Sequence, residues 1–282
     1  MIVVNSVQTL RRLIQTHRDM GHRIGFVPTM GNLHAGHLSL VQSAKQQADI
    51  VIVSIFVNPT QFGPNEDFDS YPRTFEQDQT LLEQEGADIV FAPELKEVYP
   101  NWPNLTKVQV AELGNNHCGA SRPGHFDGVT TVVSKLFNMV RPDCAVFGQK
   151  DFQQLAIIRR MTSDLNFDIE IIGAPIVRED NGLAMSSRNG YLSKDQKQQA
   201  SFIYQTLGWM KQQINKGERD YRSLEQAAIQ RLAGQNFKPD YVHIARQDNL
   251  ELAKEGDEQL VILIAAFMDK VRLIDNITLD TK

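Results

Sequence analysis

The chain has 282 residues, of which 41% are hydrophobic and 22% charged, and its formal net charge is −5 at pH 7. This length suits one large domain or two modest ones, and the acidic balance argues against a broad nucleic-acid surface. No apolar run approaches the roughly 20 residues that span a bilayer, no secretory signal is present, and the two cysteines, Cys118 and Cys144, indicate no disulfide framework or cysteine zinc site. We therefore expect a cytoplasmic protein without a nucleic-acid or membrane partner.

The first predicted unit is a strand, a glycine-containing turn and the start of a helix. Its segments are residues 24–27, 28–37 and 38–48. The turn carries two imidazoles, those of His34 and His37, while Gly31 and Gly36 allow a ligand to approach the backbone closely. Because a helix N-terminus offers free N–H groups and partial positive charge, the turn suits a phosphate, and the histidines add donors where charge develops. A zinc site is not indicated, since no third ligand stands nearby.

Further apolar segments alternate with helical patterns to about residue 172. The predicted strands are residues 49–57, 89–92, 144–147 and 169–172. The predicted helices are residues 74–85, 129–140 and 152–165. Continuous apolar strands are typical of a parallel sheet that is buried on both faces. The alternation of strands and helices therefore predicts an α/β fold with a doubly wound, Rossmann-like parallel sheet.

The pattern changes after Arg188. Ser193 is a candidate N-cap for a long polar helix that runs to about residue 215, and a second helix covers about residues 221–233. Strand-like runs follow at residues 240–245, 260–267 and 271–274. Helices followed by strands predict a smaller C-terminal α+β domain. We expect a catalytic domain over residues 1–176 and a C-terminal α+β lid domain over residues 177–282, with the boundary near residue 177.

A second chemical segment, Met185-Ser186-Ser187-Arg188, lies about 150 residues after the histidine turn. It supplies hydroxyl groups and a guanidinium on a segment that we expect to be a mobile loop closing over a nucleotide. Together the two segments indicate an enzyme that handles ATP without a Walker-type loop.

The two segments resemble known signatures. His34-Ala35-Gly36-His37 resembles the first signature of the nucleotidylyltransferase superfamily and of class I aminoacyl-tRNA synthetases, and residues 185–188 resemble the second, with Arg in place of its usual lysine. Five longer strings resemble the pantoate–β-alanine ligase family, in order and over nearly the whole chain. These strings are residues 28–37, 54–62, 71–74, 147–155 and 182–189.

This resemblance implies a reaction in two steps. Pantoate and Mg-ATP give pantoyl adenylate and pyrophosphate, and the amine of β-alanine then attacks the activated carbonyl to give pantothenate and AMP. A carboxylate resists attack by an amine, whereas its mixed anhydride with AMP has a good leaving group. The enzyme must therefore bring anions together, neutralise the developing charge and exclude water from the intermediate.

The resemblance also implies which residues form the site. The expected ATP-binding residues are Met30, Gly31, Asn32, Leu33, His34, Ala35, Gly36, His37, Gly148, Gln149, Lys150, Asp151, Val177, Met185, Ser186, Ser187 and Arg188. The expected catalytic residues are His34, His37, Lys150, Ser186, Ser187 and Arg188. Gln61 and Gln154 are expected to bind pantoate, and Gln61 also β-alanine, because neutral amides both donate and accept hydrogen bonds. His37 acts in this interpretation as a proton donor or as an electrostatic stabiliser, and the sequence leaves both open.

Other expected partners follow from the same resemblance. Mg²⁺ should be held largely by ATP and water, with Asp78 a candidate ligand through water and an ordinary helix-surface acid as the alternative. Arg122 is a further candidate near the triphosphate. The family also implies a homodimer.

Three rival functions stay open at this point. A nucleotidylyltransferase that leaves AMP on its product shares the histidine turn but does not predict the strings around Gln61 and Gln154. An aminoacyl-tRNA synthetase fragment would need a basic tRNA-binding extension, and the chain has none that we recognise. A non-catalytic nucleotide-binding regulator would bind ATP and release no pyrophosphate, and the intact His34, His37 and Lys150 argue against it.

Overall fold

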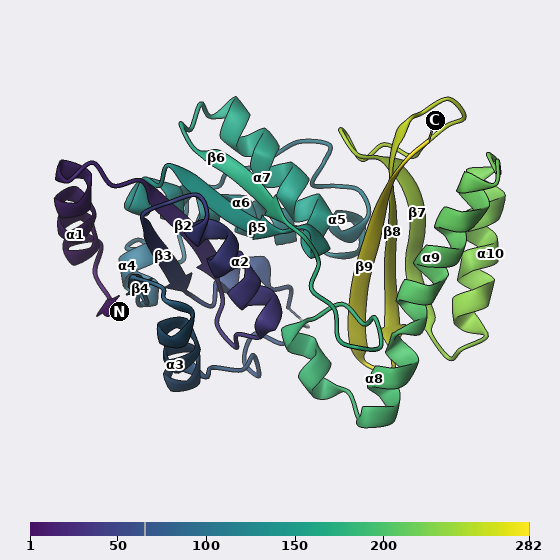
Figure 1. Ribbon diagram of the computed structural model, residues 1–282, viewed down its shortest axis with the longest axis horizontal. Helices are drawn as coiled ribbons and strands as arrows, with labels where there is room; N and C mark the ends of the chain where they lie inside the picture. Colours follow the sequence, from purple (N-terminus) through teal and green to yellow (C-terminus); the bar gives the residue numbers. More distant parts are fainter. Residues whose placement is uncertain (65, 282) are drawn as a thin grey trace.

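Six parallel strands form the larger of two sheets in the computed structural model, which describes residues 1–64 and 66–281 (Figure 1). In spatial order they are β1 (Ile2–Val4), β4 (Ile89–Phe91), β3 (Ile50–Ile55), β2 (Ile24–Thr29), β5 (Cys144–Gly148) and β6 (Glu170–Ala174). The chain moves from β2 to β3 on one side and later returns to place β5 on the other side of β2. The loops after β2 and β5 therefore diverge, and a crevice opens at the carboxyl ends of these two strands.

Helices cover both faces of this sheet. They are α1 (Val7–Asp19), α2 (Ala35–Lys45), α3 (Phe75–Glu85), α6 (His125–Val140) and α7 (Phe152–Asp164), with the short helices α4 (Leu95–Val98), α5 (Cys118–Ser121), η1 (Pro59–Gln61) and η2 (Gln149–Asp151). Ile24 and Phe26 of β2 pack into the core that includes α1, α6 and α7. Val27, on the opposite face of the same strand, packs into the core that includes α2 and α3. Each central strand is thus apolar on both faces, as its sequence predicts.

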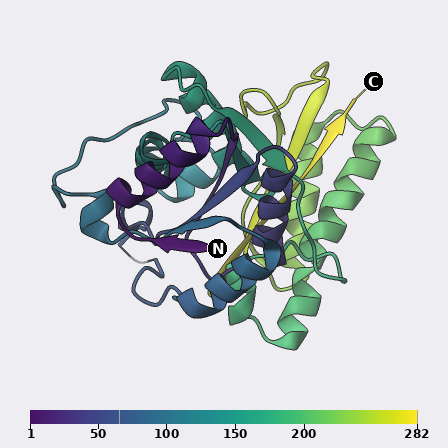
Figure 2. The ribbon, with the colours of Figure 1, turned by 60° about the vertical axis from the view of Figure 1, so that its left-hand side comes forward.

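The C-terminal domain is an antiparallel sheet with three helices. Its strands are β7 (Lys238–Arg246), β8 (Gln259–Met268) and β9 (Val271–Asp280), and its helices are α8 (Lys194–Ala200), α9 (Phe202–Asn215) and α10 (Tyr221–Ala233). In both ribbon views, these strands lie between the helices α9 and α10 and the larger domain (Figures 1 and 2). Ile262 and Ile264 of β8 face the helices, whereas Val261 and Leu263 belong to the core of the larger domain. The two domains therefore share one continuous apolar contact.

The predicted fold class is confirmed, and some of its elements differ from the prediction. The single polar helix expected from Ser193 is two helices, α8 and α9, which meet at Ser201. Ser193 does cap α8, in a reciprocal capping box with Gln196. The hydroxyl of the buried Ser201 binds the carbonyl of Gln198, so it competes with the helical ladder at the break. The last strand is also longer than predicted, because β9 extends to Asp280.

The domain boundary falls in a short stretch. The last strand of the parallel sheet ends at Ala174, and Leu183 is the first residue buried in the C-terminal core. We propose that the chain divides between them, in the stretch that contains residue 177. Among residues 1–64 and 66–281, none of the helices combines the length and the hydropathy that crossing a bilayer requires.

Candidate active site

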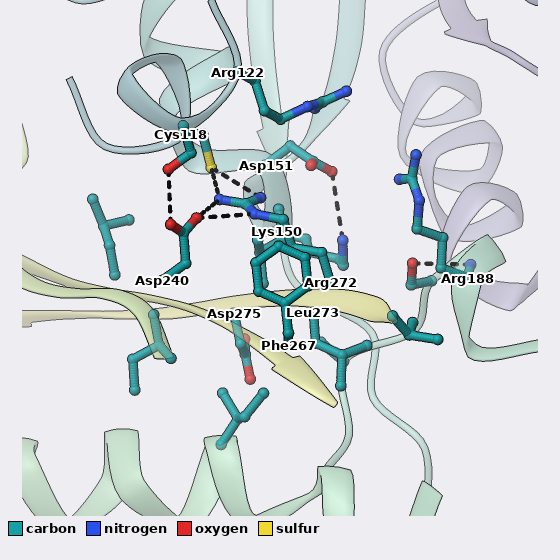
Figure 3. Close-up of a pocket in the computed structure, with 18 of the residues that line it drawn as sticks. Cys118, Arg122, Lys150, Asp151, Arg188, Asp240, Phe267, Arg272, Leu273 and Asp275 are labelled. Carbon is teal, nitrogen blue, oxygen red and sulfur yellow. Dashed lines mark hydrogen bonds and ion pairs between the residues drawn. The ribbon is translucent and has the colours of Figure 1, made fainter. Parts of the chain in front are cut away.

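The crevice at the carboxyl ends of the parallel strands contains two adjoining cavities. The smaller one measures about 250 Å³ and is lined mostly by residues of the larger domain, together with the Met185–Arg188 segment. The larger one measures about 940 Å³ and lies between the two domains. Both are lined by Arg122, Lys150, Asp151, Gln154, Ser186 and Arg188. Arg122, Lys150 and Asp151 of the larger domain line the larger cavity together with Asp240, Arg272 and Phe267 of the C-terminal sheet (Figure 3).

A buried carboxylate holds the histidine turn that follows β2. Gly31 and Asn32 have φ values of 81° and 51°, a left-handed conformation in which backbone N–H groups turn inward. Asp78 of α3 is only 1% exposed, and its carboxylate accepts hydrogen bonds from the N–H groups of Asn32 at 2.9 Å and Leu33 at 2.8 Å. A Cβ at Gly31 would lie 2.9 Å from that carboxylate. The position therefore requires glycine.

The two histidines of the turn lie side by side at the N-terminus of α2. Their ring centroids are 4.1 Å apart, and His34 Nδ1 accepts the N–H of Gly36 at 3.1 Å, which makes His34 the N-cap of the helix. A Cβ at Gly36 would lie 2.9 Å from the His34 ring. Burial, followed by the charge of Lys150, lowers the pKa of His34 to about 4. Burial, followed by His34 and Lys150, lowers the pKa of His37 to about 3. Both imidazoles are thus neutral at pH 7 and available as hydrogen-bond donors.

Lys150 lies in the η2 turn directly after β5, beside the histidine turn. Its Nζ is 3.9 Å from a carboxylate oxygen of Asp151. Asn276 of β9 donates hydrogen bonds to the carbonyl oxygens of Gln149 and Lys150, each at 2.9 Å. The C-terminal domain therefore contacts the backbone of the turn that presents the lysine.

The second motif lies against the first. Met185 donates its N–H to the Val177 carbonyl at 3.0 Å, and Ser186 caps the short helix η3 (Ser187–Tyr191) by accepting the Arg188 N–H. Ser187 Oγ donates to the carbonyl of Asn32 at 3.2 Å. The two sequence motifs thus form one structural unit.

Two arginines that line both cavities are paired with neighbouring acids. Arg188 binds Asp67 at 2.9 Å, and Arg122 makes a bidentate contact with Glu66, at 2.6 and 2.5 Å. These ion pairs raise the pKa of Arg188 and lower the pKa of Glu66, against the effect of burial in each case. The guanidinium groups are therefore positioned at the cavity with their charge balanced by adjacent carboxylates.

The two expected pantoate ligands face the smaller cavity from different elements. Gln61 ends the η1 turn after β3, where its amide oxygen accepts a hydrogen bond from Asn58 at 3.0 Å. The backbone carbonyl oxygen of Gln61 lies 2.7 Å from His125 Nδ1. Gln154 reaches the cavity from the first turn of α7, which follows β5. The side chains are brought together because β3 and β5 flank β2 in the sheet.

Not all expected site residues line this cavity. Those that do are Met30, His34, Gly36, His37, Gln61, Gly148, Lys150, Asp151, Gln154, Val177, Met185, Ser186, Ser187 and Arg188. Gly31, Asn32, Leu33, Ala35 and Gln149 do not. Leu33 is a core residue, and the Gln149 side chain donates to the Gly173 carbonyl instead.

Sequence reasoning gave no role to several residues that shape the site. Asn58 is buried and hydrogen-bonded to Tyr99, Thr60 and Gly128, and it also donates to the side chain of Gln61. Asn276 contacts the lysine turn from the other domain. Asn58 lies in one of the strings that carry the family resemblance, which is a signal for it. Asn276 had no comparable signal.

Comparison with known proteins gives concordant results. A family model described as pantoate-beta-alanine ligase matches residues 2–278. The pantothenate synthetase of Marinobacter nauticus is 52% identical over 280 residues, which are 99% of either chain. The crystal structure of pantothenate synthetase from Thermus thermophilus matches with a TM-score of 0.92 at 42% identity, covering 98% of this chain and 99% of that one. A pantoate-beta-alanine ligase from Francisella tularensis, complexed with beta-gamma ATP and beta-alanine, matches with a TM-score of 0.82 at 35% identity, covering 98% of this chain and 97% of that one.

Proposed function

This chain belongs to the pantoate–β-alanine ligase family. From that premise we propose that the smaller cavity is the site where pantoyl adenylate forms, before β-alanine reacts with it. The chain is an ATP-dependent ligase that forms pantothenate from pantoate and β-alanine. One observation carries the proposed site: the histidine turn, the lysine turn and the Met185–Arg188 segment all line the same cavity. Gln61 and Gln154 line the same cavity.

In the first step, a carboxylate oxygen of pantoate attacks the α-phosphorus of ATP, and pyrophosphate leaves. His34 and His37 donate hydrogen bonds as neutral imidazoles, because their lowered pKa values leave them without charge at pH 7. Lys150 supplies the positive charge, and the hydroxyls of Ser186 and Ser187 supply further donors to the phosphates. We therefore interpret His37 as an electrostatic stabiliser rather than as a proton donor.

In the second step, the amine of β-alanine attacks the acyl carbon, the amine loses a proton, and AMP leaves. Gln61 and Gln154 hold the pantoyl hydroxyl groups and carbonyl through amide groups that both donate and accept. The neutral amides orient pantoate without the strong ground-state binding that an arginine clamp would give its carboxylate. Substrates that fill the cavity would displace water from it, which would limit hydrolysis of the mixed anhydride.

Mg²⁺ fits this site as a partner of ATP. Within residues 1–64 and 66–281, no cluster of three or more His, Cys, Asp or Glu side chains could hold a metal alone. Mg²⁺ in nucleotide sites typically binds the phosphates, several waters and one or two carboxylates, and Asp151 is the carboxylate on the wall of the smaller cavity. When bound, the ion would neutralise phosphate charge. Asp78, whose carboxylate already accepts two backbone N–H groups, could reach it only through water, and this role stays a prediction.

We also propose that the protein is a homodimer. Residues 105–110 belong to no helix or strand, and their partly buried residues, Leu105, Val108 and Val110, are separated by exposed side chains. In the described chain, their backbone forms no backbone–backbone hydrogen bonds, and Val108 alone is held, by the hydroxyls of Thr130 and Thr131. Such a segment is a template for pairing with a second copy across a two-fold axis. Sedimentation should give twice the 31.9 kDa of one chain, and a monomer would contradict the proposal. The cytoplasmic location likewise stays a prediction.

The proposed function is tested by omitting substrates one at a time. AMP release from Mg-ATP should require both pantoate and β-alanine, while pantoate alone should support exchange of labelled pyrophosphate into ATP. Pyrophosphate exchange without pantoate, or AMP formation without any exchange, would contradict a pantoyl adenylate intermediate. ATP binding with no turnover would favour a non-catalytic nucleotide-binding protein, and a product that retains AMP would favour a nucleotidylyltransferase.

A further inference from the structure

Asn276 connects the C-terminal domain to the turn that presents Lys150. It lies in β9, is 4% exposed, and its amide Nδ2 donates to the carbonyl oxygens of both Gln149 and Lys150 at 2.9 Å. Both N–H bonds of that amide are therefore used on one short turn. Without them, two backbone carbonyl groups, each with partial negative charge, would lose these hydrogen bonds at the inter-domain contact.

The neighbouring residue on β9 makes a matching contact with the second motif. Asp275 binds Arg178 in a bidentate pair at 2.6 and 3.0 Å. Arg178 also donates to the Gly182 carbonyl at 3.0 Å and lies 3.8 Å over the Tyr204 ring. The segment from Val177 to Met185 leads directly into Ser186–Arg188. Two consecutive residues of one strand thus hold both segments that frame the phosphate side of the cavity.

We propose that Asn276 is a positioning residue for the first chemical step and acts through Lys150. Its two donors fix the peptide planes of Gln149 and Lys150, which sets the direction in which the lysine side chain leaves the backbone. They also offset the partial negative charge of two carbonyl oxygens, which would otherwise disfavour an anionic phosphate nearby. A misplacement of about 1 Å in a group that binds the transition state can reduce a rate about 100-fold. This inference rests on the proposed function of the smaller cavity.

Two substitutions at this position separate positioning from packing. Asn276→Ala removes both donors, and Asn276→Asp keeps the shape but turns acceptor oxygens toward two carbonyls. Each should lower the rate of pantoate-dependent ATP–pyrophosphate exchange about 10- to 100-fold, while KM for pantoate changes less than twofold. Asn276→Asp keeps the side-chain volume, so it remains informative if the alanine variant does not fold. Ser121→Ala is the matched control, because it removes another hydrogen bond between the domains, to Asp240 at 2.9 Å, away from the lysine turn. It should exchange at the wild-type rate.

A double-mutant cycle with Lys150→Ala decides whether Asn276 acts through the lysine. If it does, Asn276→Ala should cost less than about threefold in the Lys150→Ala background, where the side chain to be positioned is gone. Equal losses in both backgrounds, or a full exchange rate in Asn276→Asp, would overturn the inference. Absence of pantoate-dependent exchange in the wild-type protein would instead overturn the proposed function, so the two failures are distinguishable.

Discussion

Ser187 donates a hydrogen bond to the carbonyl of Asn32 at 3.2 Å, although 155 residues separate them in the chain. Each residue lies in one of the two motifs, and each motif begins a helix that faces the same cavity. A triphosphate bound there would meet both helix starts together. This contact makes the two motifs one site, and the predictions below depend on it.

Replacing His37 should slow the adenylation step. His37→Ala removes a hydrogen-bond donor from the phosphate side of the cavity, and loss of such a donor costs roughly 100-fold or more in rate. The measurement is pantoate-dependent ATP–pyrophosphate exchange. His22→Ala is the control, because His22 pairs with His17 beyond the N-terminal end of β2, at the opposite end of the sheet. Near wild-type exchange in His37→Ala would refute the assignment.

The free energy of unfolding should fall as pH is lowered from about 6.5 toward 4. The pKa of His34 is lowered to about 4 and that of His37 to about 3, whereas both groups have a pKa of 6.5 when exposed. Within this window the unfolded chain binds protons that the folded chain does not, so stability rises with pH. His37→Ala should make the slope shallower by at most about 1.4 kcal/mol per pH unit. Urea unfolding of the wild-type protein and of His37→Ala across this pH range measures the two slopes, and equal slopes would contradict the prediction.

Replacing Gln154 should weaken pantoate binding selectively. A lost hydrogen bond to a charged group costs about 1.5–3 kcal/mol, so Gln154→Ala should raise KM for pantoate roughly 10- to 100-fold. KM for ATP should change little, because the proposed function assigns Gln154 to pantoate and assigns the phosphates to other residues of the cavity. Steady-state kinetics with each substrate varied in turn tests this. Ser163→Ala, an exposed position at the far end of α7, is the control. An effect confined to ATP would mean that the pantoate assignment is wrong.

Asp78→Asn should weaken both the fold and ATP binding. The amide keeps one acceptor but turns an NH₂ group toward a backbone N–H of the histidine turn. A buried unsatisfied donor costs about 1–3 kcal/mol of unfolding free energy. Glu76→Gln, an exposed acid on the same helix, is the matched control. Denaturant unfolding and ATP titration measure the two effects, and a variant as stable as Glu76→Gln would contradict the role given to Asp78.

Much of the fold could be predicted because it depends on local signals. The run at residues 49–57 is almost continuously apolar, which predicts a buried parallel strand, and β3 occupies residues 50–55 of it. Ser193 followed by Gln196 predicts a helix start, and the capping box is present. The α1 helix was not predicted, although the signal is present: Ser6 caps it, and Val7, Leu10 and Ile14 recur at helical spacing.

The sequence by itself determined the strand and helix order and the residue types that a nucleotide site needs, because periodicity, capping and turn chemistry act over a few residues. Only the tertiary structure decided which of these groups meet. In the folded chain, Asp78 binds the histidine turn 45 residues before it, and Asn276 contacts the lysine turn 126 residues before it. Such contacts depend on how sheets and helices pack in space, and no local pattern encodes which distant carbonyl or N–H group a buried polar side chain will pair with.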